Sequence, residues 1–438
     1  MKYKASKYNA IIKQDEKEVI IFNTISGGIC SFDPESYNDL INVNESSQYF
    51  STMIDQGYLV PDTLDETQKL MNSHFSYIYD KKPEKMQYTI ALTMRCPLNC
   101  IYCFENHHSG PIMTLETAQK VKEFIFREIK NNDNCKHLHI TWFGGEPLLA
   151  PDIIEYLGEA FVSFCKEKNI TFTAKIITNG VLFKPEIFDN FIEKGIITSV
   201  QFTLDGNEET TKKVKKSKDG MFDTMIEGIK YSATKILTNV RLNVTKYNQE
   251  ELLEVVESIL KDTEKDSQLH FYSAPLVDYN TDESVSSTVL NESKLNDFKS
   301  RLTELLNKYE RYSFDTSQGV KIVSAFCGAM RLCNISIGPC GEFYKCENLI
   351  GNEKYIMGDV DTGIWHNEAM YKLPLSKISE KCKNCLYLPV CWGGCPVHAN
   401  IYKHEFDCEG FKKDLTTRLL IKANINLGKE DLQNEDTC

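Results

Sequence analysis

From about residue 86 to residue 310, short apolar runs alternate with longer stretches in which apolar residues recur every three or four positions. Each short run is typical of a buried parallel strand, and each longer stretch predicts an amphipathic helix. Parallel strands joined by helices imply βαβ units with both faces of the sheet covered. Six strand–helix pairs are too few for an eight-fold barrel. The pattern therefore predicts an α/β fold, either a partial barrel or an open α/β sheet, with strands at 87–93, 137–145, 172–180, 199–206, 239–245 and 269–276.

The flanking segments have a different pattern. Residues 1–82 contain two short apolar runs around a Ser-Gly-Gly turn, two short helical stretches and a linking helix, which predicts a separate small unit. In residues 315–438, cysteine, glycine and short strands replace the regular alternation. A segment so poor in regular elements needs another source of stability, and bound metal clusters could supply it. We therefore expect three domains, at residues 1–82, 86–310 and 315–438.

The length and net charge of the chain limit the number of domains and the classes of function to consider. A chain of 438 residues corresponds to roughly three domains. Its net charge of −12 argues against a general nucleic-acid binder, which needs a concentrated basic face. The N-terminal residues have no apolar signal-peptide core, and no apolar run is long enough to span a membrane. We expect a cytoplasmic protein with no nucleic-acid or membrane partner.

Sixteen cysteines are unusual for such a protein, and most of them lie in two groups. In a reducing compartment, closely spaced cysteines are metal ligands or catalytic groups more often than disulfides. The first group, Cys96, Cys100 and Cys103, has the spacing C-x3-C-x2-C and follows the first predicted strand. A structural zinc site would need a fourth ligand, for which His107 and His108 are candidates.

The C-x3-C-x2-C spacing, with Tyr102 just before the last cysteine, resembles the signature of the radical S-adenosylmethionine (SAM) superfamily. In that family, three cysteines bind three irons of a [4Fe–4S] cluster, and SAM chelates the fourth iron. The resemblance implies a partial (β/α)6 radical SAM barrel. It also implies reductive cleavage of SAM to a 5′-deoxyadenosyl radical, which abstracts hydrogen from an unactivated carbon.

Other motifs agree with this resemblance. The stretch WFGGEP at the end of the second strand resembles the family's GGEP motif, which binds the methionine amino group. The ends of the third and fourth strands, ITNG and TLDG, resemble the stretches that line the nucleoside, and the fifth strand offers a weaker candidate. Taken singly, each of these stretches is more often an ordinary turn. The resemblance thus predicts that the cofactor contacts Tyr102, Gly144, Gly145, Glu146, Pro147, Thr178, Asn179, Asp205 and Asn243.

The second cysteine group has the pattern C-x13-G-x4-C, then C-x2-C-x5-C-x3-C and a final cysteine. This pattern resembles the SPASM domain, which typically holds two auxiliary [4Fe–4S] clusters, so we expect three clusters in all. Cys340 is left over, as a free thiol or as a competitor of Cys333. A zinc ribbon remains the alternative for the C-x2-C pair alone. The resemblance implies one set formed by Cys327, Cys333, Cys346 and Cys395, and a second formed by Cys382, Cys385, Cys391 and Cys408.

The resemblance also suggests a substrate. SPASM enzymes mostly act on ribosomal peptides, and residues 1–82 resemble a winged-helix-like domain that binds the leader of a precursor peptide by strand addition. We therefore expect a peptide maturase that forms a cysteine thioether, with flavodoxin or ferredoxin as electron donor. Carbon–carbon crosslinking and formylglycine formation are alternatives, and a zinc-stabilised, non-catalytic binding protein is an alternative of another class.

Two further features carry weaker predictions. Glu347 stands where related sulfatase-maturating enzymes have a catalytic aspartate, so it is either a base or a surface carboxylate. The stretch NEETTKKVKKSKDG departs from relatives that have a His-Asp pair and an arginine, because Thr211, Lys212 and Lys215 occupy the corresponding positions. We interpret this lysine run as a solvated loop, with contact to an acidic leader as the alternative.

Overall fold

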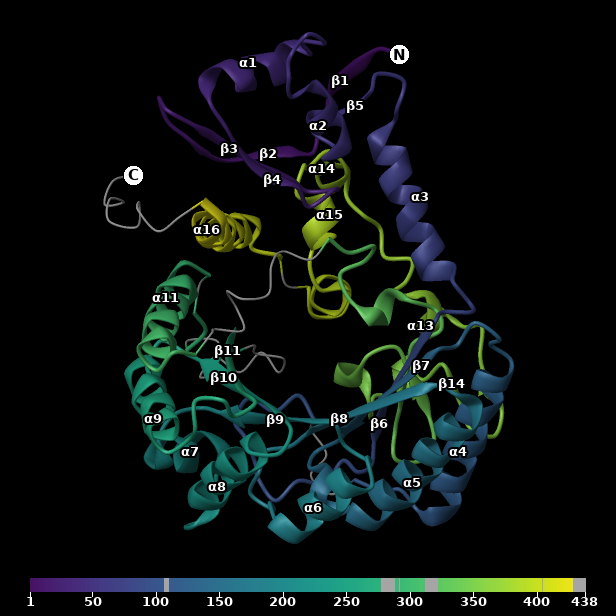
Figure 1. Ribbon diagram of the computed structural model, residues 1–438. Coiled ribbons are helices and arrows are strands. Elements are labelled where there is room, and N and C mark those ends of the chain that lie inside the picture. Colours follow the sequence, from purple (N-terminus) through teal and green to yellow (C-terminus); the bar gives the residue numbers. More distant parts are fainter. Residues whose placement is uncertain (106–109, 277–287, 291, 312–321, 404, 428–438) are drawn as a thin grey trace. The chain divides into compact units, whose positions relative to one another are not determined.

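The computed structural model describes residues 1–105, 110–276, 288–290, 292–311, 322–403 and 405–427 (Figure 1). Contacts between residues divide the chain into two units. Unit 1 comprises Met1–Tyr79, Thr316–Gly328 and Ser376–Cys438, and unit 2 comprises Asp80–Asp315 and Ala329–Leu375. The two units are described separately, and the three predicted domain boundaries stay predictions.

Unit 2 is built on an eight-stranded sheet with the order β11-β10-β9-β8-β7-β6-β12-β13. The six strands from β6 to β11 are parallel throughout, as the alternation of apolar runs predicts. The predicted α/β fold with a parallel sheet is thus confirmed. These six strands are β6 Lys85–Ala91, β7 His137–Phe143, β8 Thr171–Ile177, β9 Ser199–Leu204, β10 Leu237–Val244 and β11 Leu269–Pro275.

Helices follow the strands of this sheet. In Figure 1 the helices α4, α5, α6, α8 and α9 lie on one face of it. This arrangement agrees with the expected partial barrel, because a barrel-type sheet carries its helices on the outer side. The opposite face bears half-buried polar side chains such as His139, Lys175 and Gln201. The helices are α4 Leu115–Lys130, α5 Pro151–Lys168, α6 Pro185–Glu193, α8 Met221–Ala233, α9 Gln249–Lys261 and α11 Glu292–Lys308.

The first two strands after the barrel extend its sheet. β12 (Ile335–Ile337) pairs in parallel with β6, and β13 (Phe343–Tyr344) pairs antiparallel to β12. The sheet edge beside β6 is thus covered by the cysteine-rich segment. This addition fixes the place of Cys346, which follows β13 by two residues.

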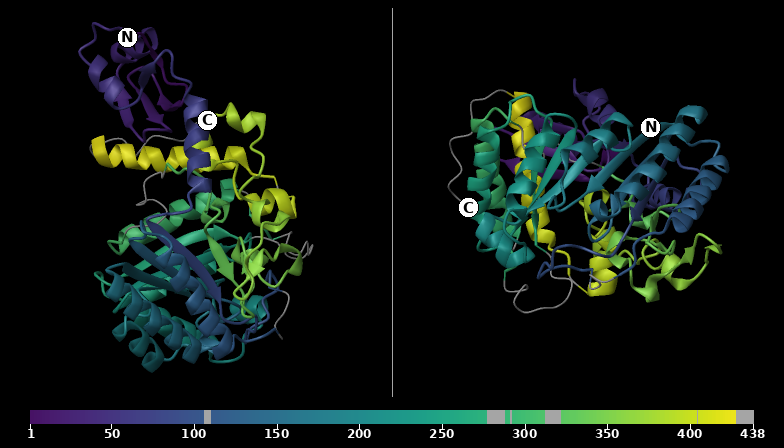
Figure 2. Two further views of the ribbon diagram at one scale, coloured as in Figure 1. Left: turned by 90° about the vertical axis from the view of Figure 1, so that its right-hand side faces the viewer. Right: turned by 90° about the horizontal axis from the view of Figure 1, so that it is seen from below.

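Unit 1 joins the two ends of the chain (Figure 2). Its antiparallel sheet has the order β2-β3-β4, formed by Asn9–Gln14, Val19–Asn23 and Ile29–Phe32. One face of this sheet packs against Leu415 and Leu419 of α16 (Cys408–Leu427). The other elements of the N-terminal segment are β1 Tyr3–Ala5, α1 Pro34–Asn42, α2 Phe50–Asp55, β5 Leu59–Pro61 and α3 Glu66–Tyr79.

The cysteine-rich segment of unit 1 packs on the N-terminal segment. This segment contains two very short helices, α14 (Glu380–Lys383) and α15 (Leu388–Cys391). Cys382 lies in α14, Cys391 ends α15, and Cys385 lies between the two helices. Leu388 and Trp392 share a small core with Tyr8 and with Leu70 of α3. The indole of Trp392 also stacks on His74, with ring centroids 4.1 Å apart.

Candidate active site

The first three cysteines lie in the loop that follows β6, at the carboxyl ends of the parallel strands, where α/β folds place their chemistry. This loop is held by the end of α7 (Glu208–Lys215), because the N–H groups of Asn99 and Ile101 donate to the carbonyls of Lys215 and Val214 at 3.1 and 3.0 Å. Within the loop, the N–H of Cys103 donates to the carbonyl of Cys100 at 3.1 Å. The cysteines are thus fixed by backbone contacts.

The three thiols lie in a poorly solvated environment. Burial raises the pKa of Cys96 and of Cys100 to about 12 and that of Cys103 to about 11. Among the described residues, no three His, Cys, Asp or Glu side chains converge as the ligands of one metal ion would. A four-iron cluster places each thiolate on a different iron, so it needs cysteines that are near one another without converging on a point. His107 and His108 lie outside the described residues.

Gly144 and Gly145 follow β7 and lie against the backbone that precedes the cysteines. A Cβ atom at Gly144 would lie 2.3 Å from the carbonyl oxygen of Thr93, and one at Gly145 would lie 2.5 Å from that of Arg95. Gly144 also has φ 132°, a conformation that favours glycine. The N–H groups of Gly145 and Glu146 donate to these same two carbonyls, at 2.9 Å each. The two glycines therefore bring the Glu146 turn against the start of the cysteine loop.

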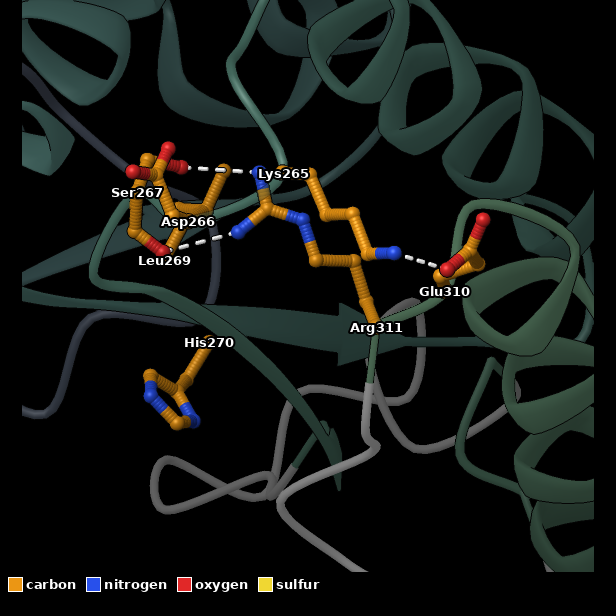
Figure 3. A pocket seen from close by; sticks show the side chains of 7 residues that line it. All are labelled: Lys265, Asp266, Ser267, Leu269, His270, Glu310 and Arg311. Atoms are coloured by element: carbon orange, nitrogen blue, oxygen red, sulfur yellow. Dashed lines mark hydrogen bonds and ion pairs between the residues drawn. The ribbon is translucent and has the colours of Figure 1, made fainter.

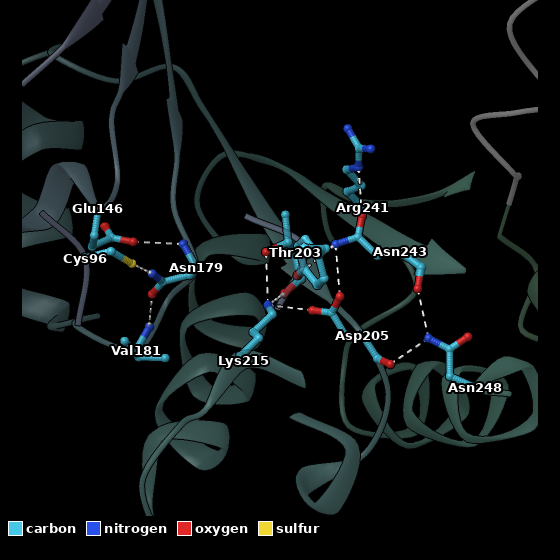
Figure 4. A network of polar contacts seen from close by, with 11 residues as sticks. Cys96, Glu146, Asn179, Val181, Thr203, Asp205, Lys215, Arg241, Asn243 and Asn248 are labelled. Atoms are coloured by element: carbon cyan, nitrogen blue, oxygen red, sulfur yellow. Dashed lines mark hydrogen bonds and ion pairs between the residues drawn. The ribbon is translucent and has the colours of Figure 1, made fainter. Parts of the chain in front are cut away.

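Glu146 is fully buried and accepts three hydrogen bonds. The N–H of Leu148 and the hydroxyl of Thr178 donate to Oε1 at 3.0 and 2.8 Å, and the N–H of Asn179 donates to Oε2 at 2.9 Å. Burial raises the pKa of Glu146 to about 7, although these donors favour the carboxylate. The side-chain amide of Asn179 in turn donates to the Cys96 sulfur at 3.4 Å (Figure 4). Pro147 begins a buried 3-10 turn directly after this carboxylate.

A second polar network lies at the ends of β9 and β10 (Figure 4). Oδ1 of Asp205 accepts from the side-chain amide of Asn243 at 3.1 Å, and the same amide donates to the Tyr102 hydroxyl at 3.3 Å. The ammonium of Lys215 forms an ion pair with Oδ2 of Asp205 at 2.9 Å and donates to the Thr203 carbonyl at 2.6 Å. The structure thus brings Tyr102, Asp205 and Asn243 together, and their contact with the cofactor stays a prediction.

The interpretation of the lysine run as a solvated loop is wrong. Residues 208–215 form helix α7, whose N-cap Asn207 accepts from the N–H of Thr210. Glutamates occupy the first turn and lysines the last, and these charges stabilise the helix by their interaction with its dipole. Lys215 is only 1 % exposed and points into the site. The acidic-then-basic order after an Asn cap is the signal that could have predicted this helix.

Glu105 is a candidate residue that the motifs did not identify. It is 6 % exposed, and its Oε2 atom has no hydrogen-bond partner among the described residues. Burial and then the nearby charge of Glu146 raise its pKa to about 8. Its position two residues after Cys103 could have drawn attention to it, but no pattern in the sequence indicates that it is buried.

Glu347 begins a 3-10 turn directly after Cys346. Its side chain is exposed, and the Cys346 thiol approaches its Oε2 at 3.8 Å. Burial lowers the pKa of Lys175 on β8, and the charge of Glu347 opposes that shift. The Glu347 carboxylate is therefore close enough to Lys175, on the polar face of the sheet, to stabilise its positive charge. The catalytic role of Glu347 stays a prediction.

The predicted auxiliary cysteines divide between the two units. Burial raises the pKa of Cys391 to about 11, and the nearby thiols of Cys385, Cys382 and Cys408 raise it further. This second set therefore lies together within unit 1. In the first set, Cys327 and Cys395 belong to unit 1, and Cys333 and Cys346 belong to unit 2, so that set stays a prediction. Cys340 is exposed.

Lys345 holds the Cys333 loop within unit 2. Its ammonium donates to the carbonyls of Arg331, Leu332 and Asn334 at 2.9, 2.7 and 2.9 Å. Burial lowers the pKa of Lys345 to about 7, and the Cys333 thiolate opposes that shift. The loop is thus fixed by a buried lysine next to Cys346.

A cavity of about 520 Å³ lies at the amino end of β11, away from the carboxyl ends that carry the cysteine loop (Figure 3). Arg311 in its wall donates to the carbonyl of Ser267 at 2.7 Å, and Lys265 pairs with Glu310. These charged groups are engaged with the protein itself, so the cavity offers no comparable set of ligands.

The residues at the carboxyl ends fit an iron–sulfur cluster with SAM. Three cysteines lie together in one loop, as a cluster held by three thiolates requires. The unpaired Oε2 of Glu105 and the carboxylate of Glu146 offer acceptors for a cationic group beside them.

No helix in the described part of the chain combines the length and apolar character needed to cross a bilayer.

Comparisons with known proteins show similarity to proteins that use such a cofactor. Residues 90–259 match the Radical SAM superfamily. The radical SAM cyclopropyl synthase TigE of Paramaledivibacter caminithermalis is 24 % identical, over 98 % of this chain and 97 % of TigE. A serine-type anaerobic sulfatase-maturating enzyme of Klebsiella aerogenes is 23 % identical, over 72 % of this chain and 80 % of its own.

Among solved structures, Streptococcus suis SuiB bound to SAM shares the fold with a TM-score of 0.55 and 16 % identity, covering 93 % of this chain and 99 % of SuiB. SuiB bound to its precursor peptide SuiA gives a TM-score of 0.52. These findings confirm a radical SAM domain at residues 90–259 and a likeness of the chain to radical SAM maturases. The fold implies a [4Fe–4S] cluster and SAM as cofactors.

Proposed function

We propose that this protein is a radical SAM maturase that installs a cysteine thioether crosslink in a ribosomally made precursor peptide. The observation that carries the proposal is the convergence of Cys96, Glu146 and Asn179 at the carboxyl ends of the sheet. The likeness to SuiB, which was solved with a precursor peptide, supports a peptide substrate. The free edge of β4, which among the described strands pairs only with β3, supports leader binding by strand addition.

The chain's own residues have distinct roles in this proposal. Cys96, Cys100 and Cys103 hold the cluster, and Glu146 and Asn179 orient the cofactor. When bound, the cofactor supplies hydrogen-atom abstraction from an unactivated C–H bond. The network of Tyr102, Asp205, Asn243 and Lys215 fixes the nucleoside side of the site.

Further residues would complete the reaction. Exposed Glu347 accepts the proton of the substrate thiol, and its charge is balanced by Lys175 nearby. The two predicted auxiliary cysteine sets would each hold a [4Fe–4S] cluster, which would supply an acceptor for the electron that remains after the bond forms. A flavodoxin or ferredoxin would supply the electron that the cluster at Cys96, Cys100 and Cys103 needs. The proximity of Cys382, Cys385, Cys391 and Cys408 supports one of these auxiliary sites.

Carbon–carbon bond formation is the second candidate. The similarity to the cyclopropyl synthase TigE favours it, because that similarity extends over nearly the whole of both chains. Both candidates remove two hydrogen atoms from the peptide, so mass alone does not separate them. They differ in whether the substrate cysteine keeps a free thiol that can be alkylated.

Mass spectrometry after anaerobic incubation tests the proposal. The reconstituted enzyme, SAM and a reductant are incubated with a cysteine-containing precursor peptide, which is then alkylated. We expect a loss of two hydrogens for each crosslink and a cysteine that no longer reacts with the alkylating reagent. The control is the triple variant Cys96→Ala, Cys100→Ala, Cys103→Ala, which should leave the peptide unchanged.

Each other result has a defined meaning. A two-hydrogen loss with a reactive cysteine would replace the thioether by a carbon–carbon bond. Conversion of the cysteine to an aldehyde would identify a formylglycine-forming enzyme. Product formation by the triple variant, or colourless zinc-containing wild-type protein, would overturn the radical assignment.

A further inference from the structure

The strands of the main sheet carry basic side chains and no acidic ones. The six parallel strands β6 to β11 contain Lys85, Lys175 and Arg241, together with three histidines, and no aspartate or glutamate. This distribution runs against the net charge of −12 of the whole chain. The three basic side chains are half-buried and alternate with buried residues, so they lie on the face opposite the helices. The strands thus make this polar face electropositive and suited to an anionic group.

Arg241 on β10 keeps two amino groups available for such a group. Its Nε donates to Oδ1 of Asn243 at 3.0 Å, which orients the guanidinium. In Figure 4 the two terminal amino groups point away from Asp205 and Lys215. Asp205 is paired with Lys215 at 2.9 Å, and no carboxylate of the described residues forms an ion pair with Arg241. The guanidinium is thus held at one nitrogen and open at the other two.

The position of Arg241 places this guanidinium next to the candidate cofactor site. Asn243, two residues further along β10, donates through its side-chain amide to the Tyr102 hydroxyl at 3.3 Å and to Asp205 at 3.1 Å. Residues two apart on a strand point to the same face, so Arg241 lies one step deeper on the polar face than this network. Hydrogen abstraction needs contact between the C–H bond and the radical carbon, so a substrate would occupy this part of the face.

The other two basic side chains of these strands are in different situations. Burial lowers the pKa of Lys175, and the charge of Glu347 opposes that shift, so this lysine has an acidic neighbour. Lys85 is the first residue of β6, at the end of the strand away from the cysteine loop. Arg241 therefore combines nearness to the cofactor network with the lack of a described acidic partner.

A guanidinium keeps its charge when half-buried and offers paired N–H donors that match the two oxygens of a carboxylate. We propose that Arg241 binds a side-chain carboxylate of the peptide substrate, so that the segment entering the site carries an aspartate or glutamate. The inference rests on the peptide substrate of the proposed function. Arg241 is thereby a specificity-determining residue for that substrate.

Chemical protection in the wild-type enzyme tests this contact. Phenylglyoxal reacts with accessible guanidinium groups, and mass spectrometry of protein fragments measures the reaction at each arginine. The probes are N-acetylaspartate amide and N-acetylasparagine amide, which differ in the charge of the side chain. With the reconstituted full-length enzyme and SAM, we expect the aspartate probe to slow modification of Arg241 about fivefold at about four times its Kd, and the asparagine probe to have no effect. Arg127, exposed on α4, is the internal control and should react at one rate throughout.

Three results would overturn the proposal. They are equal rates with the two probes, an Arg241 that does not react in the free enzyme, and protection by SAM that decarboxylated SAM does not give. The last result would assign Arg241 to the carboxylate of the cofactor.

A double-mutant cycle with the precursor of the crosslinking assay tests the same contact in the reaction. The aspartates and glutamates of the precursor are replaced singly by asparagine or glutamine. For one such peptide we expect kcat/KM to fall about tenfold with the wild-type enzyme, and the two peptides to react equally with Arg241→Gln. If Arg241→Gln loses its iron, Arg241→Lys takes its place, because it keeps the charge without the paired donors. A preference as large in the variant as in the wild type contradicts the contact.

Failure of this inference is distinguishable from failure of the proposed function. Crosslinking of a peptide, with Arg241 unprotected by the aspartate probe, refutes the inference alone. Protection of Arg241 without crosslinking of a cysteine-containing peptide refutes the proposed function alone.

Discussion

At the scale of single residues, Lys215 shows how one buried charge can organise the site. Its ammonium pairs with Asp205, while its backbone carbonyl holds Asn99 of the cysteine loop. Breaking a buried ion pair by removing one partner leaves an uncompensated charge, which costs about 3–5 kcal/mol. The lysine thus links the cysteine loop to the network on β9 and β10.

We therefore expect Lys215→Met to lower the urea midpoint of unit 2 and to reduce the iron bound by the first cysteine group. Lys212→Met, in the same helix but at a partly exposed pair with Asp219, should leave both nearly unchanged. Urea titration monitored by circular dichroism and an iron assay on reconstituted protein measure the two effects. Equal effects of the two variants would contradict the organising role of Lys215.

The same residues show what sequence reasoning can and cannot predict. Strand ends such as Asn179 and Asp205 were predictable, because residues that follow parallel strands meet at one edge of the sheet. Lys215 and Glu105 were not, because their burial depends on tertiary contacts between the cysteine loop, α7 and the Glu146 turn. A charged side chain in a sequence is ordinarily a surface residue.

At the scale of elements, the short helices around the second auxiliary set depend on their surroundings. α15 is four residues long, and helices of that length are not stable alone. Its residue Leu388 packs with Tyr8 and Leu70 of the N-terminal segment. Metal bound by the neighbouring cysteines would thus stabilise α15 and, through this small core, the start of the N-terminal segment.

This coupling gives a prediction. The double variant Cys382→Ala, Cys385→Ala should lose one four-iron cluster and speed amide exchange in β2 and α3. Peptides from β7 and β8 in unit 2 should exchange at the wild-type rate. Hydrogen–deuterium exchange followed by mass spectrometry measures both sets in one sample, and wild-type protection of β2 and α3 in the variant would contradict the coupling.

At the scale of the whole molecule, the chain assigns its predicted tasks to different units. The residues of the predicted SAM site lie in unit 2, whereas the sheet that would bind a leader lies in unit 1 and shares its core with α16. The linear order of the sequence did not reveal this, because residues 1–79 and 376–438 are far apart in the chain. Deleting the N-terminal segment would expose Leu415 and Leu419, so a point change is the better test of leader binding.

Ser31 on β4 offers such a change. The N–H of Asn23 donates to the carbonyl of Gly28, so the alternation along an antiparallel strand turns the backbone groups of Ser31 toward the free edge. Ser31→Pro removes an N–H that an added strand would use, and proline is tolerated at a sheet edge. We expect about tenfold weaker precursor binding with unchanged peptide-independent SAM cleavage, whereas Ser31→Ala, which keeps the N–H, should bind like wild type. Fluorescence anisotropy with a labelled precursor measures the affinity. Wild-type affinity of the proline variant would place leader binding elsewhere, while a loss of SAM cleavage in the same variant would show that the tasks are not divided between the units.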